Sequence, residues 1–411
     1  MRIKRSFKRN LEILKMKGTL LVLGFAFVGI VNCAKAQKVY VGGVSNNRAV
    51  VWENGTPNYL TIGEGRVMSV LVVGKDVYAV GTETVSGKRV AKTWKNGVEQ
   101  YALTDGTYDA NATSIAVSGS DVYVVGAENS AGTIGKMWKN GIAQAGYNDA
   151  RTLYSIFIDG SDVYVAGWNQ NFKAAVWKNG TLLYTLTPGG GYHVAYSVVV
   201  DNGNVYTAGQ EQINGNYTAK VWKNNAELYT LGTSKNGGFM NLFIFNGVIY
   251  VAGSGVNGGT TVAKLWTNGV GIDLSGGSNA NAVFVSGSDV YVVGGANNSK
   301  ALLWENGNLT TLSNGSAEDA YSVFAVGGGV GIAEILTTQV EIYPNPTNDK
   351  FTVEFDGIAT IKLYDMLGKE VLTQTTNGKT EININHLPKG IYNIQLFSEG
   401  KVVGNGKIVK Q

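Results

Sequence analysis

A motif that recurs seven times limits the possible folds of this 411-residue chain more than any other feature. Each copy reads approximately Ser-Val-x-Val, a Gly/Asp turn, Val-Tyr-Val-x-Gly, a variable stretch, Ala-x-x-Trp, Asn-Gly and a last apolar run. Successive tyrosines lie 38 to 45 residues apart, and four strands in a repeat of about 40–45 residues are typical of a propeller blade. The repeat predicts an all-β fold with a seven-bladed β-propeller over residues 37–331. The repeated aromatic residues are Tyr40, Tyr78, Tyr123, Tyr164, Tyr206, Tyr250 and Tyr291, and Trp52, Trp94, Trp138, Trp177, Trp222, Trp266 and Trp304.

The third copy is the template for the strands expected in each blade. Its first two strands are expected at 114–117 and 122–125, and its third ends at Trp138. Asn140-Gly141 predicts a tight hairpin, because both central residues of a type I′ turn need φ > 0. The strands are apolar on both faces, which is expected of sheets stacked between other sheets. The repeated Tyr and Trp side chains are therefore interpreted as core residues.

The two ends of the repeat region complement each other. The first copy starts at 39–43 without a Ser-Val strand before it, and the last copy ends with a surplus Ser-Val strand at 321–326. We expect these two segments to pair and close the ring of blades. Closure would also remove open sheet edges that favour aggregation.

Ligand binding is expected on the face that carries the variable loops. The turns between strands 1 and 2 and between strands 3 and 4 are short and nearly constant, whereas the other connections vary. Variable loops on a constant scaffold commonly hold binding residues, and aromatic rings mixed with amides and carboxylates suit a sugar or a peptide. For any single one of these side chains, an ordinary place in a surface loop is the favoured interpretation. The candidate ligand-binding residues are Tyr108, Asp109, Tyr147, Asp149, Trp168, Asn169, Tyr192, His193, Glu211 and Tyr217, with Glu83 and Gln170 in the same loops.

The sequence gives little support for catalysis and indicates no cofactor. The two histidines, His193 and His386, fall in different predicted domains, which argues against a multi-histidine metal site. Neither a Gly-x-Ser-x-Gly elbow nor a phosphate-binding Gly-Lys-Ser/Thr loop is present. A pair of carboxylates such as Asp109 and Asp149 could serve a glycosidase, so a hydrolase remains an alternative.

The N-terminus is expected to be a signal peptide over residues 1–36. A basic segment is followed by an apolar run at 19–31 and then by Ala34-Lys35-Ala36, a small-x-small cleavage pattern. A retained anchor is the alternative, although the run is shorter than the roughly 20 residues that span a bilayer. Without this segment, which holds the only cysteine, Cys33, the acidic residues outnumber the basic ones. The mature chain is therefore expected to lack disulfides, a transmembrane segment and affinity for nucleic acid.

The sequence changes character after the repeat region. Residues 332–339 are expected to form a linker, and 340–411 contain seven short strand-like runs separated by turns. Such spacing predicts a small immunoglobulin-like β-sandwich. The distinctive segments are 343–347, 364–371, 387–392 and 407–410. Their characteristic residues are Tyr343, Pro344, Asn345, Pro346, Gly368, Lys369, Pro388, Gly390, Tyr392, Lys407 and Lys410.

In this order, these segments resemble the type A C-terminal sorting domain of the type IX secretion system. The resemblance implies a Gram-negative cell, export by the Sec machinery to the periplasm, and passage through the outer membrane by the type IX machinery. It implies that the cargo is released or fixed to the cell surface. A plain accessory immunoglobulin-like domain is the alternative.

The sequence therefore predicts a secreted or surface-displayed propeller that acts as a binding or adhesion module. An extracellular glycan or a protein is the expected ligand. A glycan-degrading or other hydrolase, and a structural surface-coat protein, are the two alternatives.

Overall fold

The computed structural model describes residues 38–130, 132–187, 189–234, 238–297, 300–313, 317–326, 341–364, 370–398 and 401–411. The predicted signal peptide, the predicted linker, and Gly368 and Lys369 lie outside these ranges. The described residues form strands, turns and loops without a helix, so none of them belongs to a helix able to cross a membrane.

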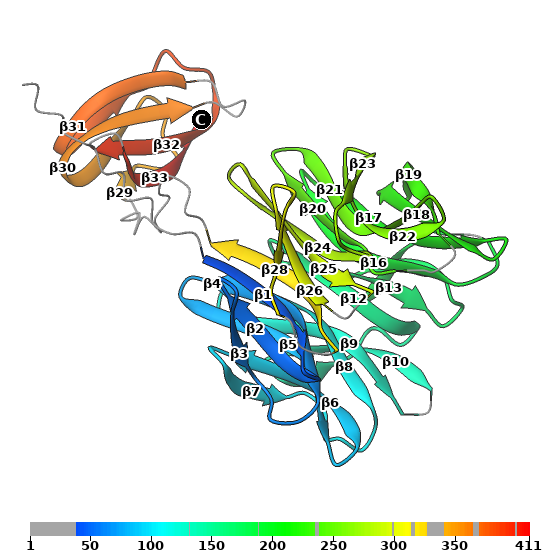
Figure 1. Ribbon diagram of the computed structural model, residues 1–411. Coiled ribbons are helices and arrows are strands. Elements are labelled where there is room, and N and C mark those ends of the chain that lie inside the picture. Colours follow the sequence, from blue (N-terminus) through cyan, green and yellow to red (C-terminus); the bar gives the residue numbers. More distant parts are fainter. Residues whose placement is uncertain are drawn as a thin grey trace, which may run out of the picture. The chain divides into compact units, whose positions relative to one another are not determined.

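The repeat region forms seven four-stranded antiparallel sheets among its described residues (Figure 1). Sheets 2 to 7 each consist of four consecutive strands, whereas sheet 1 takes its first strand from the far end of the region. We call the first strand of each sheet its inner strand. The strands of sheets 1 to 3 are β28 (Asp319–Val326), β1 (Lys38–Ser45), β2 (Arg48–Glu53) and β3 (Thr56–Tyr59); β4 (Gly65–Val73), β5 (Asp76–Val85), β6 (Lys88–Lys95) and β7 (Val98–Ala102); and β8 (Ala110–Ser118), β9 (Asp121–Asn129), β10 (Thr133–Lys139) and β11 (Ile142–Gln144). Those of sheets 4 to 7 are β12 (Ala150–Asp159), β13 (Asp162–Asn169), β14 (Ala174–Lys178) and β15 (Thr181–Thr185); β16 (His193–Asp201), β17 (Asn204–Ile213), β18 (Asn216–Lys223) and β19 (Ala226–Ser234); β20 (Asn241–Phe245), β21 (Val248–Asn257), β22 (Thr260–Thr267) and β23 (Val270–Leu274); and β24 (Asn279–Ser286), β25 (Asp289–Ala296), β26 (Lys300–Glu305) and β27 (Asn308–Thr311).

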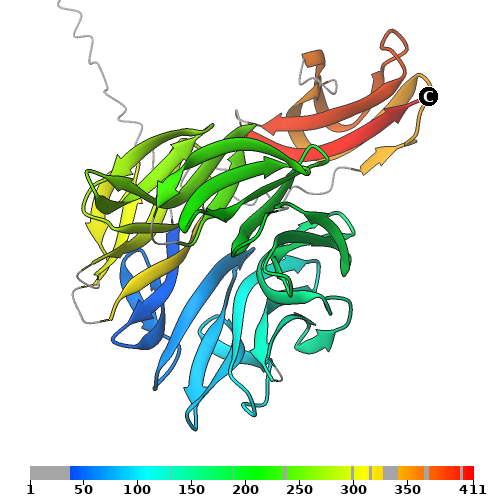
Figure 2. The ribbon, with the colours of Figure 1, turned by 90° about the vertical axis from the view of Figure 1, so that its right-hand side faces the viewer.

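The predicted pairing of the two ends of the repeat region is confirmed. Strand β28 pairs antiparallel with β1, with Val323 opposite Val41 and Ala325 opposite Val39 (Figures 1 and 2). Each sheet contacts the next in sequence, and sheet 7 contacts sheet 1 through β24, β25 and β28. Apolar residues of sheets 7 and 1, among them Tyr291 and Trp52, share one core cluster. The repeat region is thus an all-β, propeller-like arrangement of repeated sheets.

The first asparagine of each turn between the third and fourth strands links two hairpins of its sheet; six of these turns are Asn-Gly and the fifth is Asn224-Asn225. In sheet 3, Asn140 has φ 51° and Gly141 has φ 81°, as the predicted type I′ turn requires. The Asn140 Oδ1 accepts a hydrogen bond from the Val122 backbone N–H at 2.8 Å, and its Nδ2 donates to Asp121 at 2.9 Å. Lys139 pairs with the same aspartate at 2.7 Å. The side-chain to backbone bond recurs in all seven copies, at Asn54, Asn96, Asn140, Asn179, Asn224, Asn268 and Asn306.

The repeated tryptophans lie in the core, as predicted. All seven are at most 3% exposed. Because residues of neighbouring sheets share the core clusters, each tryptophan packs in the layer between two sheets. Replacing a buried Trp by Ala costs about 3–5 kcal/mol, so these residues are the main apolar contribution of each repeat.

A β-bulge recurs near the start of the inner strands. The register shifts between Ala112 and Ser114 in β8, and between Leu153 and Ser155 in β12. A bulge leaves one residue without a partner in the ladder and redirects its side chain. The residues bypassed in this way are Met68, Thr113, Tyr154, Tyr196, Asn281 and Tyr321.

The residue after the bulge joins neighbouring sheets. The hydroxyl of Ser322 in sheet 1 accepts a hydrogen bond from the Val70 N–H in sheet 2, at 3.0 Å. Ser114, Ser155 and Ser197 make the equivalent bond to the following sheet, and Asn241 does so with its amide oxygen. The serine of the Ser-Val motif therefore has an inter-sheet role.

The tail forms a second β unit with its own core. Its strands are β29 (Glu341–Tyr343), β30 (Lys350–Tyr364), β31 (Glu370–Asn383), β32 (Gly390–Ser398) and β33 (Lys401–Lys410). The first half of β30 pairs with β29 and the second half with β32, while β31 follows it throughout. Four of the seven expected runs are thus merged into two long strands, because β30 continues through a register shift between Phe355 and Ile358.

Candidate functional site

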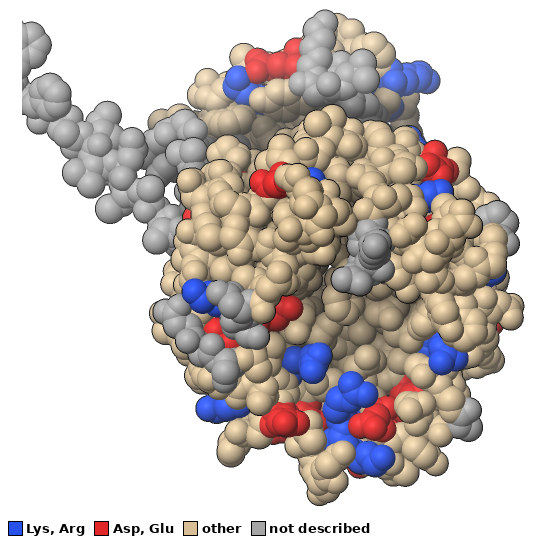
Figure 3. Space-filling model, turned by 45° about the vertical axis from the view of Figure 1, so that its right-hand side comes forward, with Lys and Arg blue, Asp and Glu red and all other residues tan. Residues whose placement is uncertain are grey.

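A cavity of about 640 Å³ opens among the inner strands, on the face of the predicted variable loops. Its walls come from sheets 4, 5, 6, 7 and 1, where the inner strands begin and the second strands end. Figure 3 shows a hollowed face whose walls are largely uncharged, with charged side chains around it. The lining residues are Tyr154, Trp168, Tyr192, Val194, Tyr196, Gln210, Tyr217, Gly238, Phe239, Ser254, Thr261, Ser278, Asn279, Asn281, Asn297, Asp319 and Tyr321.

Aromatic rings form the wall contributed by sheets 4 and 5 and the loop before β20. Tyr154 and Tyr196 meet edge to face with ring centroids 5.1 Å apart, and Phe239 lies 5.5 Å from Tyr196. The Gln210 Nε2 donates to the Tyr196 hydroxyl at 2.8 Å, which fixes that ring. Burial raises the pKa of both tyrosines, so they stay neutral hydrogen-bonding groups near neutral pH.

The rim of this wall is a cluster of Arg151, Trp168, Phe172 and Tyr192. Phe172 lies 5.4 Å from Trp168 and 5.1 Å from Tyr192. The Arg151 guanidinium covers Phe172 at 4.8 Å. Tyr192 is 51% exposed, so its ring is open to a ligand that enters the cavity.

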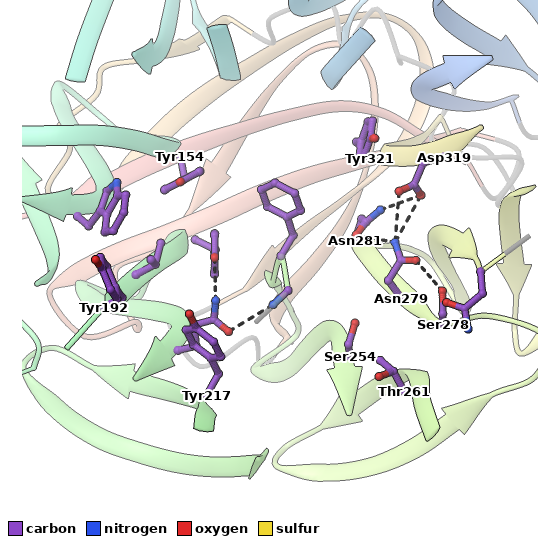
Figure 4. A pocket seen from close by; sticks show the side chains of 17 residues that line it. Tyr154, Tyr192, Tyr217, Ser254, Thr261, Ser278, Asn279, Asn281, Asp319 and Tyr321 are labelled. Atoms are coloured by element: carbon purple, nitrogen blue, oxygen red, sulfur yellow. Dashed lines mark hydrogen bonds between the residues drawn. The ribbon is translucent and has the colours of Figure 1, made fainter. Parts of the chain in front are cut away.

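The opposite wall, from sheets 7 and 1, carries amides and one carboxylate (Figure 4). The Asp319 Oδ1 accepts hydrogen bonds from the Ala320 N–H at 2.9 Å and from the Asn281 Nδ2 at 3.1 Å. Asn279 approaches both carboxylate oxygens, at 3.4 and 3.5 Å. Burial raises the pKa of Asp319 to about 6, although these donors and the charge of Arg66 act against the increase. Burial also raises the pKa of the neighbouring Tyr321 to about 12.

A narrower space of about 100 Å³ borders the cavity and shares Tyr154, Tyr196, Phe239, Asn281 and Tyr321 with it. Every one of the seven sheets contributes lining residues to this space, from the inner strand or the loop just before it. The bypassed residues at the bulges are all among them. In six of the seven sheets, the bulge therefore places one bypassed side chain at a common space, to which sheet 6 contributes Phe239, Met240 and Asn241.

Three of the ten candidate residues line the cavity. Trp168 is the residue before the last in β13, Tyr192 precedes β16 and Tyr217 lies in β18. They belong to the second-to-third-strand loops and the connection between sheets, where function was expected.

Four candidates from sheets 2 to 4 lie outside the cavity lining. Tyr108 is 43% exposed, and Asp109 accepts from the Arg89 N–H at 2.9 Å. Tyr147 is 4% exposed and packs on Trp177, and burial raises its pKa to about 12. Asp149 accepts from the Trp177 indole N–H at 2.9 Å. Asp109 and Asp149 are thus each held in place by a different local partner.

The remaining three candidates have polar partners within their own sheet or loop. The Asn169 side chain accepts from the backbone N–H groups of Asn171 and Lys173 and so orders the loop after β13. His193 is 1% exposed, and burial together with Lys173 lowers its pKa. Glu211 pairs with Lys220 at 2.7 Å, as Glu83 pairs with Lys92 at 2.6 Å. None of these residues lines the cavity.

The inner-strand residues of the cavity, which include Tyr154, Asn281, Asp319 and Tyr321, were not among the candidates. They lie in strand segments, and a bulge takes Tyr154, Asn281 and Tyr321, but not Asp319, out of the regular alternation. The available signal was the residue before the Ser of the Ser-Val motif, which changes from copy to copy while the serine is largely kept. Among the described residues, no three His, Cys, Asp or Glu side chains lie together so that they could hold a metal ion.

The characteristic residues of the tail hold its ends together. The buried Lys410 Nζ donates to the carbonyls of Ile384, Asn385 and Leu387, at 2.6 to 2.8 Å. The Asn345 side chain accepts from the Val409 N–H at 3.0 Å. In the same unit, the Tyr392 hydroxyl donates to the Pro388 carbonyl at 2.6 Å, and Tyr343 bonds to Glu354 at 2.8 Å.

The fold and the tail together define an all-β, propeller-like repeat protein with a C-terminal export domain. Residues 341–411 match the family described as the secretion system C-terminal sorting domain, which confirms the resemblance. This tail implies that the type IX secretion machinery is a partner of the chain, and that the protein is secreted or attached to the cell surface.

Comparison with other proteins gives partial likenesses. A segment of 111 residues is 32% identical to the endo-acting ulvan lyase of Formosa agariphila, and the match covers 25% of this chain and 22% of the lyase. The computationally designed Ika8 protein matches with a TM-score of 0.41 and 16% identity, over 77% of this chain and 93% of that chain. A thermostable family-43 glycoside hydrolase matches with a TM-score of 0.31 and 13% identity, over 53% and 90%. At TM-scores below 0.5, the likenesses to structures carry no inference about activity.

Proposed function

We propose that this protein is an exported glycan-binding module, in which seven sheets act as the blades of a closed propeller and the central cavity receives the glycan. The pairing of β28 with β1 and the space shared by all inner strands support the propeller. The proposal includes a cleaved signal peptide over 1–36, Sec export from a Gram-negative cell, a linker at 332–339 and an immunoglobulin-like tail.

The observation that carries the proposal is the composition of the two cavity walls. One wall presents aromatic rings, including Tyr154 and Tyr192, and the other presents the amides of Asn279 and Asn281 and the carboxylate of Asp319 (Figure 4). A sugar ring has an apolar C–H face and a belt of hydroxyls, so it can stack on rings while its hydroxyls bond to amide and carboxylate oxygens. The volume of about 640 Å³ is within the usual range for small-molecule sites.

Glycan degradation is the second candidate function. Asp319 is a cavity carboxylate with a pKa near 6, which suits a general acid or base. The partial match to the ulvan lyase also favours a glycan as the substrate. However, hydrolysis by the usual mechanism needs two carboxylates, and Asp319 is the one carboxylate among the described lining residues. A binding role therefore fits the cavity better.

The test is a glycan array with the full exported chain and two tyrosine variants. Tyr192→Ala should remove most binding, whereas Tyr108→Ala should leave binding unchanged. The two residues are similarly exposed, at 51% and 43%, but only Tyr192 lines the cavity. Equal losses in both variants, or no glycan bound by the unaltered chain, would reject the cavity as a glycan site. The second outcome would favour a protein ligand or a surface-coat role, and release of shortened products would favour an enzyme.

A further inference from the structure

We propose that Asp319 is a specificity-determining residue that makes the cavity select uncharged sugars over uronate or sulfated sugars. This inference rests on the proposed glycan-binding function and names the substrate class for that site. It concerns the charge of the ligand, which the aromatic wall alone does not determine.

The first argument is the charge of the lining. Asp319 is the one formally charged group among the described lining residues, because the others are aromatic, aliphatic, amide or hydroxyl side chains and glycine. Among described residues, no Lys or Arg nitrogen forms an ion pair with it within 4 Å. Arg66 acts on it only as a weaker, more distant charge. A carboxylate or sulfate beside Asp319 would meet a like charge without a cation in the lining, because Arg151 lies at the rim of the opposite wall, over Phe172.

The second argument is the fixed orientation of the carboxylate. Two donors, the Ala320 N–H and Asn281 Nδ2, hold Oδ1 at 2.9 and 3.1 Å, while among the described residues Oδ2 has only the longer contact with Asn279 at 3.5 Å. Oδ2 therefore keeps acceptor capacity for a ligand hydroxyl. A carboxylate accepts hydrogen bonds and cannot donate them when ionised, so it favours a neutral polyol and rejects an anion.

The third argument is that the backbone leaves space for this carboxylate. A Cβ added at Gly295 would lie 2.6 Å from the Asp319 Oδ1. The absence of a side chain at Gly295 on β25 thus leaves room for the Asp319 carboxylate, which reaches from β28 to Asn279 and Asn281 on β24. The residues around the carboxylate position it and do not neutralise it.

The experiment compares matched pairs of oligosaccharides at pH 8, with the full chain. The probes are galactan and oligogalacturonate hexamers, and glucan and oligoglucuronate hexamers. The neutral member of a bound pair should bind at least tenfold more tightly. In Asp319→Asn, which keeps the amide oxygen as an acceptor, the preference should fall below threefold. Asp159→Asn is the control, because it makes the same change at an exposed turn at the other end of an inner strand.

A pH arm tests the same idea without a substitution. The charged and titratable groups that act on Asp319 include Arg66 on β4 and Tyr321 on β28, and burial raises the pKa of Tyr321 to about 12, so its hydroxyl stays neutral between pH 5 and 8. The preference of the unaltered chain should therefore decrease towards pH 5, where Asp319 is protonated. If a pair binds with no charge preference, with a preference for uronate, or with a preference that Asp319→Asn retains, the inference is overturned while glycan binding stands. If no member of any pair binds, the proposed function itself fails.

Discussion

Replacing Asp319 by asparagine should stabilise the repeat region at pH 8 and have little effect below pH 4. Burial raises the pKa of Asp319 from 3.8 to about 6 on folding. An acid with a raised folded pKa adds stability below its unfolded pKa and loses that contribution as the pH rises through about 6. The difference corresponds to about 3 kcal/mol in favour of the variant at pH 8. For a repeat region of nearly 290 residues, this is a rise in melting temperature of roughly 5 °C.

Tryptophan fluorescence during urea unfolding measures this effect selectively. All eight tryptophans of the chain lie between residues 52 and 304, so the signal reports the repeat region and not the tail. The quantity to compare is the difference in unfolding free energy between Asp319→Asn and the unaltered chain, at pH 3.5, 6 and 8. Asp159→Asn provides the matched control for the loss of one negative charge. A difference that is the same at all three pH values would refute the assigned burial of the Asp319 charge.

Three further predictions concern the turn, the rim and the tail. Asn140→Ala should destabilise the repeat region by about 2 kcal/mol, because it loses the hydrogen bond to the Val122 N–H and strains a positive φ. Asn140→Gly should cost about half as much, because glycine loses the same bond but adopts a positive φ without strain. Urea unfolding of both variants measures the two free-energy changes. Tyr192→Ala should change the free energy of unfolding by no more than about 0.5 kcal/mol. Its loss of glycan binding, measured by calorimetry, would then reflect a lost contact with the glycan. Lys410→Met leaves three carbonyls without their charged donor and should destabilise the tail by about 3 kcal/mol or more. Limited proteolysis should then cut the tail faster while the tryptophan signal of the repeat region stays native.

Local chemistry made most of the repeat fold predictable from the sequence. The Asn-Gly pair demands positive φ at both residues, and the surplus strand at 321–326 had one unfilled place to pair. The tail was harder to divide into strands, because β30 and β31 continue through positions that resemble turns. A bulge lets a strand bend without ending, and a sequence pattern does not distinguish the two cases.

The site was predicted less completely, for a reason of geometry. Trp168 lies near the end of β13 and Tyr192 lies just before β16, next to loops in which sequence variation marks them. Tyr154 and Asn281 have strand neighbours on both sides, and alternation alone assigns them to no particular face. Their position depends on a one-residue register shift, which changes the face of every residue on one side of it. A place beside a variable segment also does not ensure exposure, because the predicted candidates Tyr147 and His193 are both buried.

In sheets 1, 3, 4 and 5, the bulge places a residue that lines the central space directly before a serine that bonds to the following sheet. In sheets 3, 4 and 5, a serine joins its sheet to the next, and the residue before it is Thr113, Tyr154 or Tyr196. Because the bypassed residue makes no ladder bond, its side chain can change without breaking the ladder, although the Thr113 hydroxyl also donates to the Val125 and Leu153 carbonyls. The serine cannot change freely, because it accepts the backbone N–H of the neighbouring sheet. The chemistry of the central cavity can thus vary from one repeat to the next on a constant scaffold, and this independence explains how one wall became aromatic and the opposite wall polar.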